Sequence, residues 1–145
     1  MVVTAEAFAA RNAAQQRAGK LAQDIALASE ITRLRIAGHA TPEAAVTDVS
    51  DRPSLGYDLR SCEVDGTVRC IEVKSARRSG DVLEFFVSEN ERRRASELSN
   101  YFFYLVLDLE GPRQEVVMLR GAAVLEKWFS AVQFRVAAPA LRGQF

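Results

Sequence analysis

This 145-residue sequence has no formal net charge and contains few histidines and cysteines. Lysine plus arginine equals aspartate plus glutamate at 19 each, so no overall basic field attracts nucleic acid. Any affinity for nucleic acid must therefore come from local patches. Histidine occurs once, at His39, and a lone loop histidine is expected to be a solvated surface group rather than a ligand or a general base.

Cysteines and long apolar runs are also scarce. Cys62 and Cys70 are the only two cysteines, and their spacing does not indicate a zinc site. We expect both to be reduced and half-buried, which fits a cytoplasmic location. The sequence contains no run of about 18 apolar residues, so no membrane span is expected. The N-terminus has no basic region followed by an apolar core, so we expect no secretory signal.

The remaining composition, 48% hydrophobic and 26% charged, is that of a globular protein, and the length fits a single domain over residues 1–145. A long alanine-rich helix is predicted from Thr4 to about Ala37, with an apolar stripe from Leu21 onward. Residues 1–18 have a poor stripe and are interpreted as a separate helix, a partner-binding arm or a frayed end. Residues 19–109 form the predicted core, and 110–145 a C-terminal extension of strand, helix and strand.

The rest of the chain predicts a meander of strands, a helix and a buried strand. Ser88 and Glu91 have the form of a capping box, which opens a helix to about Leu98. The other predicted elements are a short strand at 44–50, a hairpin around Asp65-Gly66, a basic turn at 75–80, strands at 82–87, 101–109 and 115–119, a helix at 122–129 and a strand at 134–136. The predicted fold class is α/β (α+β), a mixed sheet with helices packed on it.

The hairpin decides whether three charged side chains share one face. With a two-residue turn, Asp58 lies opposite Val73 and points away from Glu72. With a three-residue loop, Glu63 pairs with Thr67, Gly66 takes the left-handed position, and Asp58 lies opposite Glu72. The hydrophobic pattern favours this second register, because it places Tyr57, Leu59, Ile71 and Val73 on one face and Asp58, Glu72 and Lys74 on the other.

Paired carboxylates with a nearby lysine are suited to metal-assisted hydrolysis. Asp58 and Glu72 offer oxygen ligands to a hard cation such as Mg²⁺ or Mn²⁺. Lys74 could orient or polarise an attacking water. Together, Asp58, Glu72 and Lys74 are the smallest set of side chains that metal-assisted phosphodiester hydrolysis requires. The alternative is a solvated strand face with a cross-strand ion pair.

The stretch containing these residues reads "GYDLRS…DGTVRCIEVKS…FFVSENERRRASELSNYFFYLVLDL". It resembles, over roughly residues 19–109, the domain of unknown function typified by the C-terminal region of the protein NO VEIN. The element order also resembles the PD-(D/E)XK restriction-endonuclease-like fold, whose core is helix, three-stranded meander, helix and strand. In that superfamily an aspartate opens the second strand and an acid-x-lysine triplet lies on the third.

The resemblance implies roles for several residues. Asp58 and Glu72 would be metal ligands, the backbone carbonyl of Val73 would complete the coordination, and Lys74 would orient water. The family's first helix carries an acid where this chain has Gln23, and a second family glutamate matches Glu30. Gln23 would then be the catalytic residue at this position, able to accept a hydrogen bond but supplying no charge. Alternatively, Asp24 or Glu30 could substitute for it, or activity could be lost.

From the residues themselves, Glu91 is either the capping partner of Ser88 or a group over the site. Arg77, Arg78, Arg92 and Arg93 could hold phosphates beside the site.

Two functions follow as expectations. The first is a metal-dependent nuclease acting on DNA, in a restriction or defence context, with a fused or partner subunit such as a helicase and no membrane association. The second is a catalytically inactive module of the same fold that binds nucleic acid or protein. Assembly through residues 4–18, as a homodimer, is a third and weaker expectation.

Overall fold

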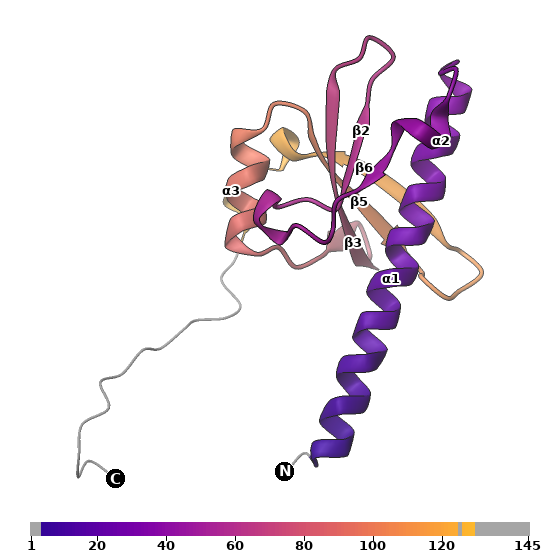
Figure 1. The fold of residues 1–145 in the computed structure, drawn as a ribbon. Coiled ribbons are helices and arrows are strands. Elements are labelled where there is room, and N and C mark those ends of the chain that lie inside the picture. The colour runs from indigo at the N-terminus through magenta and orange to yellow at the C-terminus, as the bar shows by residue number, and fades with distance from the viewer. Residues whose placement is uncertain (1–3, 125, 130–145) are drawn as a thin grey trace.

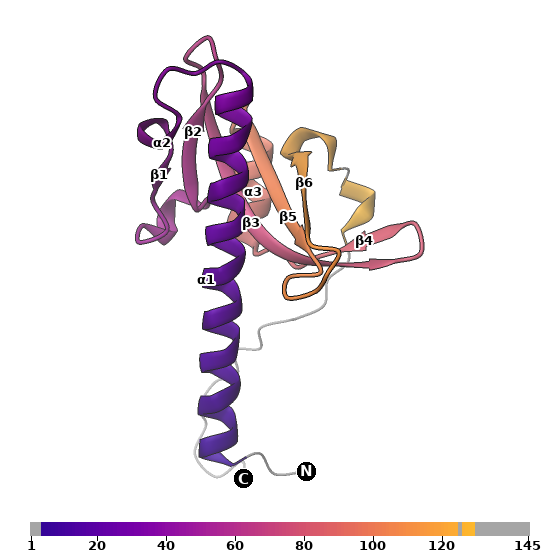
Figure 2. The same cartoon turned by 90° about the vertical axis from the view of Figure 1, so that its right-hand side faces the viewer.

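A mixed six-stranded sheet separates the two main helices of the protein. In the computed structural model, which describes residues 4–124 and 126–129, α1 (Ala5–Ile36) packs on one face and α3 (Glu89–Glu97) on the other (Figures 1 and 2). The strands are β1 (Thr47–Asp48), β2 (Leu59–Cys62), β3 (Val68–Ser79), β4 (Val82–Glu84), β5 (Tyr101–Leu107) and β6 (Glu115–Arg120). This arrangement confirms the predicted α+β class.

The strand order is β1-β2-β3-β5-β6, and β4 pairs with the far end of β3. β3 and β5 are parallel, and the other pairs are antiparallel. All seven residues of β5 are buried, as expected for a central strand covered on both faces. Alternate side chains of β5 enter different cores: Tyr101, Phe103 and Leu105 lie on the α3 side, and Phe102 and Tyr104 on the α1 side.

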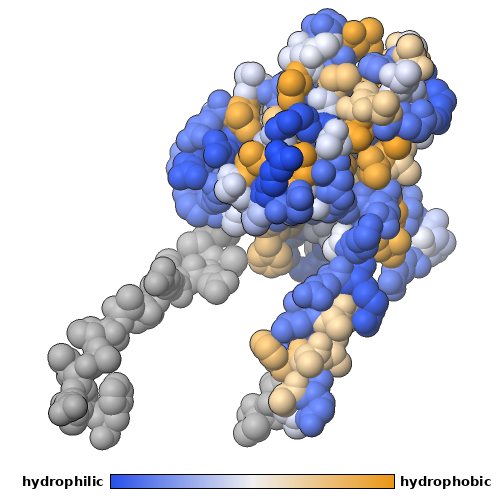
Figure 3. All heavy atoms as spheres, in the orientation of Figure 1, coloured by the Kyte–Doolittle hydropathy of each residue, from blue (hydrophilic) through white to orange (hydrophobic). Residues whose placement is uncertain are grey.

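Helix α1 is one continuous helix, so the interpretation of its first part as a separate helix is wrong. The Thr4 hydroxyl accepts a hydrogen bond from the Ala7 N–H at 3.1 Å and caps the start. Burial begins only at Ala22 and recurs every four residues, which matches one helical face: Ala22, Ala26, Glu30 and Leu34. The N-terminal half projects beyond the sheet (Figure 2), carries both hydrophilic and hydrophobic residues (Figure 3), and leaves Phe8 59% exposed.

The hairpin between β2 and β3 has the predicted register. Leu59 pairs with Ile71 and Cys62 with Val68. The Glu63 N–H donates to the Thr67 carbonyl at 2.7 Å, and Gly66 has a φ of 90°, so the loop has three residues.

The prediction that Tyr57 shares a face with Leu59 and Ile71 is wrong. Tyr57 lies outside β2, and its ring packs with Cys70 on the α3 side, whereas Leu59 and Ile71 pack on the α1 side.

Several predicted boundaries are also wrong. The basic turn at 75–80 is strand, because β3 continues to Ser79 and gains hydrogen-bond partners from β4, which is shorter than expected. The segment predicted as a strand at 44–50 contains a helical turn, α2 (Pro42–Ala45), opened by its proline, and the two-residue β1. Near 122–129 the described residues form two 3-10 turns, η2 (Gly121–Ala123) and η3 (Glu126–Trp128). The predicted strand at 134–136 lies outside the described residues.

Candidate functional site

Asp58 and Glu72 meet where β2 begins beside β3. The Asp58 N–H donates to the carbonyl of Ile71, the residue that pairs with Leu59, at 2.9 Å, so the backbone of Asp58 is tied to β3. The Asp58 Oδ2 accepts a hydrogen bond from the Val73 N–H at 2.9 Å, so the carboxylate is held against the strand that carries Glu72. Because the N–H and C=O of one strand residue point the same way, the Val73 carbonyl faces the same edge as Asp58.

Lys74 and Glu91 complete a compact charged cluster with these two acids. Lys74 lies two residues after Glu72 on β3, and its Nζ is 3.5 Å from Glu72 Oε1. The same Nζ is 2.7 Å from Oε1 of Glu91, in the first turn of α3. The structure therefore brings the predicted residues Asp58, Glu72 and Lys74 together. Glu91, predicted either to cap α3 or to lie over the site, does both.

Burial dominates the electrostatics of the cluster. It raises the pKa of Glu72 to about 10, with help from the neighbouring charges of Asp58 and Glu91, against the opposing effect of Lys74. Burial also raises the pKa of Asp58, although the Val73 N–H and Lys74 oppose it. Burial lowers the pKa of Lys74, but Glu91 and Glu72 outweigh it and the net shift is upward. At neutral pH the site therefore holds a proton on Glu72.

A cavity of about 280 Å³ opens onto these carboxylates. It lies between the loop before β2 and the N-terminal end of α3, and its lining residues are Ser50, Pro53, Gly56, Tyr57, Asp58, Glu72, Ser88, Asn90 and Glu91. Sequence reasoning did not assign Ser50 or Asn90 to the site. The position of Asn90 next to Glu91 at a capped helix start could have indicated it, whereas the sequence contains no local signal for Ser50.

Gly56 allows α3 to approach the loop that carries Asp58. Its φ is 75°, and a Cβ at this position would lie 2.5 Å from Arg94 Cγ. The Gly56 carbonyl accepts a hydrogen bond from the Tyr101 hydroxyl at 2.6 Å. The loop is thus fixed between α3 and β5, and Asp58 follows two residues later.

We expect Gly56→Ala to destabilise the protein by about 1–3 kcal/mol, because an L side chain is strained at this φ and meets Arg94. Urea denaturation measures the loss. Gly66→Ala is the control, since it also has a positive φ but nothing lies within 4 Å of the added Cβ. Equal losses in the two variants would show that close packing against α3 is not important.

Gln23, predicted to be catalytic, lies behind the cavity wall. Its side-chain N–H₂ group donates to Asp48 Oδ2 at 2.7 Å and to Ser50 Oγ at 3.3 Å. Ser50 lines the cavity, so Gln23 supports the wall, and it is not among the lining residues. Asp24 is exposed and pairs with Lys20 at 2.8 Å.

Glu30, predicted as an additional site residue, is on the α1 side of the sheet and away from the carboxylate cluster. It is fully buried and binds Arg33 through both oxygens, at 2.7 and 2.9 Å. Its Oε1 also accepts a hydrogen bond from the Tyr104 hydroxyl at 2.6 Å, and that hydroxyl accepts one from Arg69. Glu30 therefore anchors α1 to the sheet through a buried polar network.

The four arginines proposed to hold phosphates each have an acidic partner in this structure. Arg77 pairs with Glu84, Arg78 with Glu115, Arg92 with Glu126 and Arg93 with Glu97. All are at least partly exposed, so the pairs can open at little cost. Phosphate binding by these residues stays a prediction.

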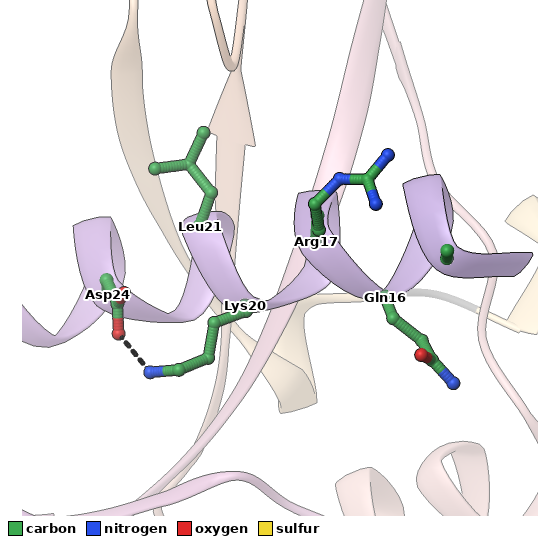
Figure 4. Close-up of a pocket in the computed structure, with 6 residues that line it drawn as sticks. Gln16, Arg17, Lys20, Leu21 and Asp24 are labelled. Carbon is green, nitrogen blue, oxygen red and sulfur yellow. Dashed lines mark hydrogen bonds and ion pairs between the residues drawn. The ribbon is translucent and has the colours of Figure 1, made fainter. Parts of the chain in front are cut away.

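A second hollow lies along α1 and is lined by Ala13, Gln16, Arg17, Lys20, Leu21 and Asp24 (Figure 4). All six residues come from α1, and two of them, Lys20 and Asp24, form an ion pair one helical turn apart. Among the residues that the structure describes, no second element contributes a converging group, so this hollow is a groove in the helix surface. None of the helices in the described part of the chain has the length and apolar character needed to cross a bilayer.

The fold and the site define an α+β domain with a sheltered pair of carboxylates, Asp58 and Glu72, and a lysine at the junction of β2, β3 and α3. Residues 22–119, well over half of the chain, match the family described as "Protein NO VEIN, C-terminal". The chain belongs to this family. Comparisons with curated proteins and with solved structures gave no match.

Proposed function

We propose that this protein is a metal-dependent nuclease of the PD-(D/E)XK, restriction-endonuclease-like superfamily that hydrolyses phosphodiester bonds in DNA. One observation carries the proposal: the partly buried carboxylate of Asp58, just before β2, and the buried carboxylate of Glu72 on β3 share a cluster with the Lys74 ammonium. The element order supports it, since α1, the meander β1-β2-β3, α3 and β5 follow one another as the resemblance implies. The assignment to DNA rests on analogy with that superfamily.

The side chains at the site fit a magnesium ion. Mg²⁺ commonly binds through one or two carboxylates and substrate phosphates while it keeps several waters. Asp58, Glu72 and the Val73 carbonyl would supply such a partial set. No group of three His, Cys, Asp or Glu side chains is arranged as a metal cage within residues 4–124 and 126–129, so the proposal rests on this smaller set. The elevated pKa of Glu72 is further support, because a cation would stabilise the charged form that burial disfavours.

Bound Mg²⁺ would supply charge neutralisation at the scissile phosphate and a more acidic water. The protein's own groups have separate tasks. The Val73 N–H keeps the Asp58 carboxylate oriented toward β3. The Lys74 ammonium orients the attacking water and stabilises negative charge that develops in the transition state. The cavity between the loop and α3 would admit the phosphate to the carboxylates of Asp58 and Glu72, which line it.

The inactive-module alternative is favoured by one observation. Gln23 occupies the first-helix position at which the resemblance implies an acid, and its N–H₂ group is engaged by Asp48 and Ser50. This alternative expects no heat of Mg²⁺ binding in calorimetry.

The test is cleavage of plasmid and single-stranded DNA by the purified protein with Mg²⁺ or Mn²⁺. We expect Asp58→Asn and Lys74→Met to lower the rate at least about 100-fold. Asp65→Asn is the matched control, since Asp65 lies in the exposed turn of the same hairpin. Activity that survives in both site variants would refute the assignment, and calorimetry then separates an inactive metal site from no site.

A further inference from the structure

Glu91 has two partners at once, and only one of them belongs to its helix. Within α3, the Glu91 Oε1 accepts the Ser88 N–H at 2.9 Å and the Glu91 N–H donates to the Ser88 hydroxyl at 3.1 Å, which completes the predicted capping box. The same Oε1 is 2.7 Å from Lys74 Nζ on β3. The helix cap is therefore joined to the sheet through one carboxylate oxygen.

The cap alone does not explain the charge on Glu91. A capping box works with glutamine as well as glutamate, because it needs only a side-chain acceptor for the N-cap N–H. Glu89 also lies in the first turn and already places a negative charge at the positive end of the helix dipole. The negative charge of Glu91 faces the Lys74 ammonium, 2.7 Å from its Oε1.

The pair is sheltered from water, which strengthens it. The side chains of Lys74 and Glu91 are 20% and 18% exposed, compared with 71% and 55% for the surface pair Lys20–Asp24. Sheltered ion pairs are screened less than exposed ones.

Lys74 needs such a partner if its ammonium is to keep one position. Its four-carbon stem is flexible, and its other acidic neighbour, Glu72, is farther away, with 3.5 Å between Lys74 Nζ and Glu72 Oε1. We propose that Glu91 is a positioning residue, which fixes the Lys74 ammonium beside the carboxylate pair and links it to the start of α3. Its catalytic meaning rests on the proposed function, whereas the placement of Lys74 can be measured without activity.

Amine labelling followed by mass spectrometry measures that placement. The chain has only three lysines, and the exposed Lys20 serves as an internal reference. In Glu91→Gln, which keeps the cap, we expect the labelling rate of Lys74 relative to Lys20 to rise about fivefold or more. Glu97→Gln is the matched control, because Glu97 is an exposed acid on the same helix and pairs with Arg93 and Arg94. It should leave the Lys74 rate unchanged.

A conservative variant and the kinetics complete the test. Glu91→Asp keeps the charge, so its Lys74 should label more slowly than in Glu91→Gln. If the protein cleaves DNA, Glu91→Gln should lower kcat about tenfold or more with little change in KM. Equal Lys74 labelling in wild type and Glu91→Gln, or in the Asp and Gln variants, would overturn the proposal. Faster labelling in a protein that never cleaves DNA would support the positioning role and refute the nuclease.

Discussion

Replacing Glu72 by glutamine is expected to stabilise the protein at neutral and alkaline pH. The folded state raises the pKa of Glu72 from an ordinary 4.5 to about 10, mainly through burial and then through Asp58 and Glu91. Between these two values the unfolded chain ionises Glu72 while the folded chain keeps it protonated. The contribution of Glu72 to the free energy of unfolding is therefore fully present below pH 4.5, and it is lost steadily as the pH rises toward 10. Glutamine has no proton to lose and removes this penalty.

We expect Glu72→Gln to raise the free energy of unfolding at pH 8 by on the order of 1–3 kcal/mol, and the melting temperature by about 3–10 °C. Thermal melts from pH 5 to 9 in chelator should show a flatter pH profile for the variant, with convergence at low pH. Glu84→Gln is the control, because its pair with Arg77 is exposed and worth little.

The metal dependence of these melts bears on the proposed function. Magnesium should raise the melting temperature of the wild type and leave that of Glu72→Gln almost unchanged, because a ligand that binds only the folded state stabilises it. A site residue whose loss increases stability is typical of functional rather than structural selection. If Glu72→Gln melts lower than wild type at pH 8, the ion pair with Lys74 outweighs the cost of burying the carboxylate.

Replacing Glu30 by alanine is expected to have the opposite and larger effect. The substitution leaves the partly buried Arg33 guanidinium without its bidentate partner and removes the acceptor of the Tyr104 hydroxyl. Breaking one side of a buried ion pair costs about 3–5 kcal/mol, so the midpoint of urea denaturation should fall sharply.

Asp24→Asn provides the matched comparison for Glu30→Ala. It removes an acid from the same helix, but its pair with Lys20 is exposed, so the loss should stay below about 0.5 kcal/mol. In the folded fraction, Glu30→Ala should retain the metal affinity of the wild type, because the network lies across the sheet from Asp58. A loss of under about 1 kcal/mol would mean that Arg33 finds a substitute, for which Glu63, 3.3 Å away, is the nearest candidate.

The sequence was most informative where local rules apply. Period-two alternation and a glycine suited to positive φ predicted the hairpin register, and that register brought Asp58 beside Glu72. The spacing of Ser88 and Glu91 predicted the cap of α3. These features depend on residues a few positions apart, whose geometry is set by backbone stereochemistry.

The errors concern which elements meet in space. Glu30 was assigned to the site from the family resemblance, as the match to a family glutamate on the first helix. Its four-residue spacing from Ala26 and Leu34 instead places it in the buried stripe against the sheet. Nothing local reveals that this stripe covers the face opposite the carboxylate cluster. In the same way, Ser50 reaches the cavity only because α3 and the loop before β2 close on each other.

The long first helix has a mechanical consequence. The family match begins at Ala22, the residue at which α1 becomes buried, so residues 5–21 form a strut outside the matched region. This projecting segment and the buried half, which packs on the sheet, belong to one continuous helix. The two halves of α1 therefore move together as one rigid body. At 1.5 Å per residue the projecting segment is about 25 Å long. Whatever binds near Phe8 would therefore be held at a set distance and direction from the body of the domain.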